Sequence, residues 1–141
     1  MNAQEIFETV VRHLSKQGRR SMRALHGAER PEWIEGGAPA MRCAYRGDGG
    51  TMCAIGVLIP DEEYRPTLEG LLVRSLLDRA DIGTAVAALR RHASLLFELQ
   101  RAHDSVMPNN GPIAIRLARI ACAYELDGRQ VAELPWPEVW A

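Results

Sequence analysis

The chain has 141 residues, the size of one domain built around a single hydrophobic core. Apolar residues make up 47% and charged residues 25%, which excludes a disordered or fibrous protein and favours a small soluble one. The formal net charge of −1 disfavours a nucleic-acid partner, and the apolar runs are too short to cross a bilayer, so no membrane association is expected.

The start of the chain and its cysteines predict the compartment. Acidic residues come early, and the basic and then apolar layout of a secretory signal is missing, so export is not expected. Three cysteines in such a chain are expected to be reduced thiols. The sequence therefore predicts a cytoplasmic location, and no motif in it calls for a cofactor.

The first predicted element is an N-terminal helix within residues 1–20. Asn2 and Glu5 have the spacing of a capping box, and Gly18 is expected to end the helix. Between them, apolar residues recur at helical spacing: Ile6, Phe7, Val10, Val11 and Leu14. This stripe predicts a helix that packs on a core by one face.

A β-hairpin is predicted over residues 41–59, after a loop over residues 21–39 that is rich in Gly and Pro. Its arms, 41–46 and 51–59, flank a glycine-rich turn. Gly56 in the second arm indicates a bulge or the close approach of another backbone. The acidic sequence PDEEY (residues 60–64, here the PDEEY corner) follows the hairpin.

Residues 67–126 are predicted to form the helical part. A short helix is expected within 67–79, a long one from about 84 to 105, and a last one from 112 to 126 with Gly128 as its stop. Trp136 and Trp140 in the Pro- and Trp-containing tail, 129–141, are expected to dock on the chain's own core, with docking into a partner as the alternative. The predicted fold is mainly α (α+β), with helices packed around one β-hairpin in a single compact domain, 1–141.

An enzymatic hypothesis centres on Cys53, which lies beside small residues and would need a base to form a thiolate. His103 is predicted to lie on the inner stripe of the long helix and is the best candidate for that base. Asp104, the residue after His103, is the third candidate catalytic residue, as the acid that would orient the imidazole. Adjacent helical side chains diverge by roughly 100°, so Asp104 is expected to pair with Arg101 or to end the helix, instead of orienting His103. The alternative for Cys53 is a small, buried core residue.

A metal site is not expected from the spacing of the donors. Cys43 and Cys53 are too far apart in sequence for a zinc knuckle. His92 and His103 would lie about 16 Å apart on one helix, too far for one ion. A zinc-stabilised interaction module is therefore only the third class of function considered.

Several short segments resemble the shared core of a family of small uncharacterised proteins from bacteria and tailed phages. They are YRG (45–47), CAIG (53–56), LIPDEEY (58–64), EG (69–70) and LQRAHD (99–104). The resemblance implies no established activity, but it does imply an accessory role in a phage or mobile element. It also implies that six residues belong to one constellation: Tyr45, Arg46, Cys53, Asp61, Tyr64 and His103.

The leading hypothesis is a small binding or accessory protein, whose hairpin and PDEEY corner form a recognition surface for an unknown protein or small molecule. Its candidate binding residues are Tyr45, Arg46, Asp61, Glu62, Tyr64 and Glu69. The alternative is a cysteine-dependent hydrolase or transferase, with Cys53 as nucleophile and His103 as base. The enzyme requires a partly exposed Cys53 within hydrogen-bond reach of His103, whereas the binding protein shields this thiol. A homodimer stays open.

Overall fold

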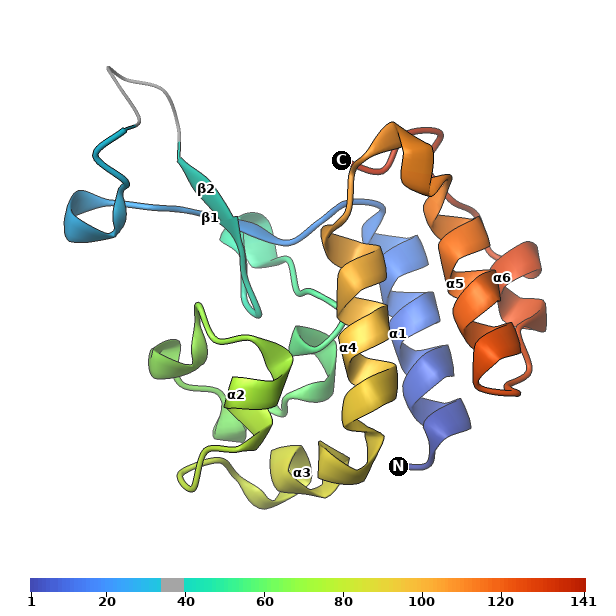
Figure 1. Ribbon diagram of the computed structural model, residues 1–141, viewed down its shortest axis with the longest axis horizontal. Coiled ribbons are helices and arrows are strands. Elements are labelled where there is room, and N and C mark those ends of the chain that lie inside the picture. The colour runs from blue at the N-terminus through green and yellow to red at the C-terminus, as the bar shows by residue number, and fades with distance from the viewer. Residues whose placement is uncertain (34–39) are drawn as a thin grey trace.

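The computed structural model describes residues 1–33 and 40–141 and confirms a mainly α fold with one antiparallel strand pair (Figure 1). The helices are α1 (Ala3–Gln17), α2 (Val73–Leu77), α3 (Thr84–Ala87), α4 (Ala93–Asp104), α5 (Ile113–Ala123) and α6 (Arg129–Glu133), and the strands are β1 (Met22–Ala24) and β2 (Met41–Cys43). Helices α1, α4, α5 and α6 lie together on one side, and the strands with α2 and α3 lie on the other. Within the described ranges, none of the helices combines the length and apolar character that a bilayer crossing requires.

Helix α1 begins and ends where its local sequence predicts. Asn2 Oδ1 accepts the Glu5 N–H at 2.8 Å, and Glu5 Oε1 accepts the Asn2 N–H at 3.2 Å, which completes the capping box. Gly18 adopts a left-handed conformation with φ of 71°, and its N–H donates to the Leu14 carbonyl.

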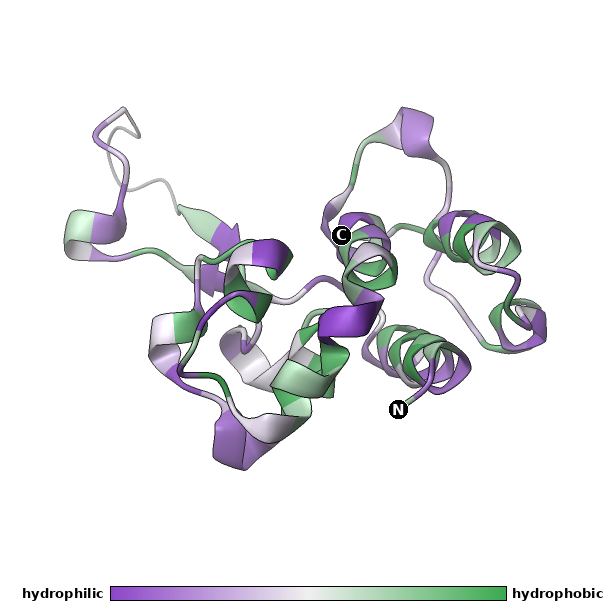
Figure 2. Cartoon of the chain, turned by 60° about the horizontal axis from the view of Figure 1, so that its bottom comes forward, coloured by the Kyte–Doolittle hydropathy of each residue, from purple (hydrophilic) through white to green (hydrophobic). Residues whose placement is uncertain are grey.

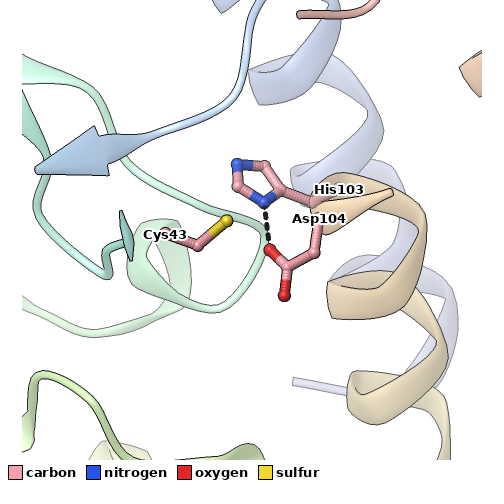
Figure 3. A group of neighbouring side chains, drawn as sticks. All are labelled: Cys43, His103 and Asp104. Carbon is pink, nitrogen blue, oxygen red and sulfur yellow. Dashed lines mark hydrogen bonds and ion pairs between the residues drawn. The ribbon is translucent and has the colours of Figure 1, made fainter. Parts of the chain in front are cut away.

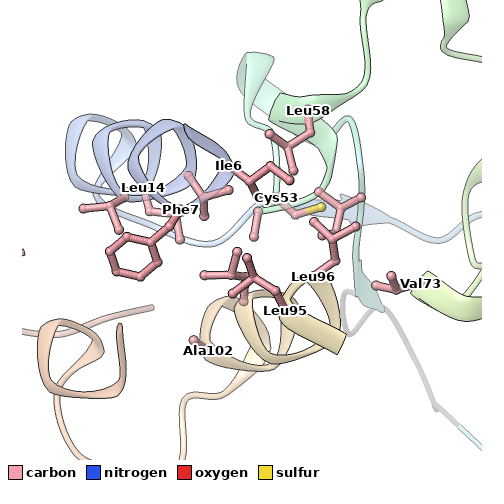
Figure 4. Packing of buried hydrophobic residues seen from close by; sticks show 14 of the residues in the cluster. Ile6, Phe7, Leu14, Cys53, Leu58, Val73, Leu95, Leu96 and Ala102 are labelled. Atoms are coloured by element: carbon pink, nitrogen blue, oxygen red, sulfur yellow. The ribbon is translucent and has the colours of Figure 1, made fainter. Parts of the chain in front are cut away.

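The core lies where the apolar faces of the helices meet (Figure 2). The predicted stripe of α1, from Ile6 to Leu14, is fully buried, and Leu96 and Leu99 of α4 are equally inaccessible. Figure 4 shows these side chains converging with residues of the segment that follows β2. Burial of each large apolar side chain contributes about 2 kcal/mol, so these contacts dominate the stability of the fold.

The strand partner of β2 differs from the prediction. Strand β2 pairs with β1, with Met22 opposite Cys43 and Ala24 opposite Met41, so part of the predicted loop is a strand. Residues 34–39 of that loop prediction lie outside the described residues.

The second arm of the predicted hairpin is wrong beyond its first residues. A bridge joins Arg46 and Met52, so the chain does turn back at 47–50, but a 3-10 helix at Gly56–Leu58 replaces the expected strand. The physical reason is that the apolar run from Cys53 to Ile55 is at most 1% exposed, and Gly56 after it is also buried. An apolar run buried on every side has no alternation that would separate a strand from a helical turn.

The helical part follows the prediction in outline and departs from it at two points. The long helix is interrupted, because a 3-10 segment at Ala88–His92 separates α3 from α4. Arg90 Nε in this segment donates to the Leu77 carbonyl at 2.7 Å and ties it to α2. After α5 the left-handed residue is Glu125, with φ of 54°, whereas Gly128 directly precedes α6 and is not the helix stop.

The prediction that the tail docks on its own core is confirmed. Trp140 is 7% exposed, and its Nε1–H donates to the His103 carbonyl at 2.8 Å. Trp136 lies half-buried against the core and donates from Nε1 to the Val131 carbonyl at 2.8 Å. Both indole N–H groups are therefore satisfied within the chain, as a buried tryptophan requires.

We predict that Gly56→Ala destabilises the protein by about 3 kcal/mol or more. A β-carbon at this position would lie 2.0 Å from the Tyr45 carbonyl oxygen, so two backbone segments would have to separate. Chemical denaturation measures the change. Gly18→Ala is the matched control, because its φ of 71° is strained but its surroundings are open, and we expect a loss of only about 1 kcal/mol. Equal losses in the two variants would contradict the close-approach explanation.

Candidate functional site

A chain of buried polar groups crosses the interior between the strands and the end of α4. Thr51 Oγ1 donates to Ser21 Oγ at 3.2 Å, and the Ser21 backbone N–H donates to His103 Nε2 at 2.9 Å. Ser21 and His103 are fully buried. Because Nε2 accepts a hydrogen bond from a backbone amide, it carries no proton, and the proton of the neutral ring is on Nδ1.

Asp104 accepts a hydrogen bond from Nδ1–H and extends the chain of hydrogen bonds to the surface. His103 Nδ1–H donates to Asp104 Oδ1 at 2.7 Å, and Gln100 Nε2 donates to the same oxygen at 2.8 Å. The side chain of Asp104 is 41% exposed, while that of His103 is inaccessible. A catalytic His–Asp pair needs the opposite arrangement, with the imidazole facing the substrate.

Of the two expectations for Asp104, the pair with Arg101 is wrong, and its place at the end of the helix is confirmed. Asp104 is the last residue of α4, and its neighbour Ser105 has an extended backbone, so the carboxylate can fold back over the helix end to reach His103. The divergence of adjacent side chains holds for continuous helix and not for this last residue. Arg101 lies 3.5 Å from Glu98 instead.

Cys43 is the cysteine that lies beside this pair. Its Sγ, His103 Nδ1 and an Asp104 carboxylate oxygen all lie within 4.8 Å of one another (Figure 3). Burial and then the charge of Asp104 raise the pKa of Cys43 to about 11. The group is therefore a thiol at neutral pH and lacks the thiolate that nucleophilic catalysis requires.

These three side chains form the one cluster of metal-ligand type in the described part of the chain, but the His103 ring opposes metal binding. Ligation through Nδ1 would move the ring proton to Nε2. There it would face the Ser21 N–H, and two donors would oppose each other in a buried site. The geometry therefore favours a hydrogen-bonded role for Cys43, His103 and Asp104.

Cys53 has neither feature that the hydrolase hypothesis requires. It is 1% exposed and packs in the core (Figure 4), where Sγ accepts the Gly56 N–H at 3.3 Å. Burial raises its pKa to about 12. The ring nitrogens of His103 are engaged with Ser21 and Asp104, so His103 does not serve Cys53 as a base.

Five of the six predicted binding residues meet in one network around Glu69. Glu69 Oε1 accepts the Tyr45 N–H at 2.8 Å, while Oε2 accepts the Arg46 N–H at 3.0 Å and the Tyr64 hydroxyl at 2.7 Å. Arg46 pairs with Asp61 at 2.9 Å and lies 5.2 Å from the centre of the Tyr64 ring. These contacts hold the 45–52 turn against the segment 60–70.

The sixth predicted residue, Glu62, is exposed and takes no part in this network. Its neighbour Glu63 accepts the backbone N–H groups of Ala85 and Val86 at 3.1 and 3.0 Å, at the start of α3. Most polar side chains of the PDEEY corner thus make contacts within the chain. The role of this corner in recognition stays a prediction.

A pocket of about 500 Å³ opens beside this network, between β2, residues 70–73 and α4. Its lining is apolar at Cys53, Leu71, Leu72, Val73 and Phe97. Polar groups surround the mouth: Arg42, Gln100, Arg101 and Asp104. A concave apolar site with a few convergent polar groups is typical of ligand binding.

Sequence reasoning missed most of this pocket. Phe97 is 42% exposed on the solvent side of α4, and Arg101, one turn on, has its guanidinium 5.9 Å from the centre of that ring. An aromatic residue on the polar face of a predicted helix is the signal that could have indicated it. Arg42 belongs to a three-residue strand and gave no comparable signal.

No family model matches the chain, and no curated protein or solved structure matches it significantly. Function is therefore inferred from the geometry of the pocket and of the residues around it.

We predict the order in which the thiols of the folded protein react with iodoacetamide. Cys122 is exposed and reacts first, while Cys43 and Cys53 react at least about a hundredfold more slowly than in the unfolded chain, because burial and raised pKa values suppress both thiolates. Peptide mass spectrometry after timed labelling measures each rate. Fast labelling of Cys53 in the native state would restore the hydrolase hypothesis.

Proposed function

We propose that the protein is a binding module that takes a small anionic ligand with an apolar body into the pocket between β2 and α4. The observation that carries this proposal is the combination of an apolar lining with two arginines at the mouth. The volume of about 500 Å³ lies in the range of small-molecule sites.

The apolar part of the pocket suits a hydrocarbon or aromatic group. Leu72 is 77% exposed and Phe97 is 42% exposed, so both hold apolar surface that a ligand would remove from water. Cys53 and Val73 are buried behind them and close the base of the pocket. A polar ligand would leave this surface without a favourable contact.

The charge at the mouth favours an anion. Arg42 is exposed, its guanidinium has no hydrogen-bonded or ionic partner in the part of the chain that the structure describes, and its Nη1 lies beside Gly70. Among the described residues, the one ion pair of Arg101 is an exposed contact with Glu98, a kind of contact that contributes little. Asp104 also lines the pocket, but Oδ1 is already engaged by His103 and Gln100.

The accessory role in a phage or mobile element, and a cytoplasmic location, are the broader parts of this proposal. The resemblance of YRG, CAIG and LIPDEEY to small bacterial and phage proteins supports the first, and the three reduced cysteines support the second. The pocket supplies a binding activity for such a protein without requiring a reactive thiol.

Decanoate and decanol are a matched pair of probes for the pocket, because they share a chain and differ in charge. We predict that decanoate binds at least five times more tightly than decanol in isothermal titration calorimetry, because the arginines at the mouth favour the carboxylate. Arg42→Gln should reduce the affinity for decanoate about fivefold to twentyfold and leave decanol unchanged. Leu72→Ala should weaken both.

Arg74→Gln is the control, since Arg74 is an exposed arginine on α2 that does not line the pocket. It should leave both affinities unchanged. Equal binding of decanoate and decanol, or an Arg42→Gln variant that binds decanoate as the unaltered protein does, would rule the proposal out.

A further inference from the structure

A second concave surface lies between α4 and α5 and is separate from the 500 Å³ pocket, although Arg101 and Asp104 line both. It is an open groove of about 920 Å³. Arginines line it from two helices, Arg101 from α4 and Arg116 and Arg119 from α5. Asn109 and Asn110, from the turn Pro108–Asn110 that connects these helices, add side-chain amides.

Arg116 has hydrogen-bonding capacity that the fold leaves unused. Its Nη1 donates to the carbonyls of Ala102 and Ser105, at 2.6 and 3.0 Å, where α4 ends. Its Nη2 has no partner among the described residues, and its Nε, which is buried, has none there either. Burial lowers the pKa of Arg116, the direction expected of a cation that no carboxylate compensates.

Arg119 lies one turn after Arg116 on α5. It is exposed, and its guanidinium has no hydrogen-bonded or ionic partner among the described residues. Arg101, across the groove, pairs with Glu98 at 3.5 Å, and Asp104 is engaged by His103 and Gln100. With three guanidinium groups against the carboxylates of Glu98 and Asp104, the groove has one excess positive charge.

We infer that this groove binds a phosphate group, free or carried as a phosphomonoester, with Arg116 and Arg119 as its main donors. The donors come from α4, α5 and the connecting turn, so they approach from more than one plane. That arrangement suits a tetrahedral oxyanion, whereas a planar carboxylate is satisfied by one guanidinium fork.

The test is a titration of the full-length, isotope-labelled protein with inorganic phosphate, at constant ionic strength against chloride, followed by amide shifts in NMR spectra. We expect saturable shifts confined to the turn Pro108–Asn110 and α5. Arg119→Gln should weaken phosphate binding at least fivefold, while Arg42→Gln, outside the groove, should leave it unchanged. Phenyl phosphate distinguishes the sources: tighter binding than phosphate points to an ester and equal binding to the free ion, and both support the site.

Arg116 also holds the end of α4, so a variant without its charge and donors would be expected to unfold. We therefore use Arg116→Lys, which keeps a positive charge and a hydrogen-bond donor. We expect Arg116→Lys to weaken phosphate binding at least threefold. Arg119→Gln should leave decanoate binding unchanged, because Arg119 does not line the 500 Å³ pocket. The phosphate site and the decanoate site are therefore tested independently of each other. The inference is overturned by shifts that do not saturate, by acetate binding as tightly as phosphate, or by unchanged affinity in both α5 variants.

Discussion

The hydrogen bond from the Ser21 backbone N–H to His103 Nε2 is the interaction on which the rest of the structure depends. It joins residues 82 positions apart and connects the start of β1 to the end of α4. It also fixes the ring proton on Nδ1, which then donates to Asp104. Asp104 lines both the pocket and the groove, so one buried imidazole positions a carboxylate that the two surfaces share.

The C-terminal tail closes over the same histidine. Trp140 donates from Nε1 to the His103 carbonyl, and its ring meets the imidazole edge to face, with centroids 6.0 Å apart. Loss of the imidazole would leave the Ser21 N–H buried without an acceptor, which costs about 1–3 kcal/mol. It would also remove the ring that Trp140 covers. Packing and hydrogen bonding therefore converge on one residue, and a role as a free catalytic base would sacrifice both.

What the sequence could predict was decided by how local each signal is. The capping box of Asn2 and Glu5, the apolar stripe and Gly18 all act within one helix, and α1 forms as they predict. Strand β1, the partner of β2, is separated from it by residues 25–40. Each strand has three residues, which is too short for an alternation of apolar and polar residues that would indicate the pair. The buried run that begins at Cys53 has no such alternation, and a 3-10 helix at Gly56–Leu58 takes the place of the expected strand.

The candidate site shows the same limit. The resemblance grouped six residues, and four of them, Tyr45, Arg46, Asp61 and Tyr64, meet around Glu69. The other two have other partners: Cys53 bonds with Gly56, and His103 with Ser21 and Asp104. The cysteine was predicted from its small neighbours, but small neighbours also permit tight packing, and Cys53 is core. Cys43 and the pocket-lining residues depend on how α4 lies against β2 and residues 70–73, which no short pattern encodes.

The tautomer of His103 is the most direct test of this account, and nitrogen-15 NMR of the neutral side chain measures it. Protonated and unprotonated ring nitrogens have well-separated shifts. We predict a protonated Nδ1 and an unprotonated Nε2 that lies in hydrogen-bond contact with the Ser21 amide. A proton on Nε2 would contradict the account, because the Ser21 amide would then face a second donor and Asp104 would lose the hydrogen bond that positions it.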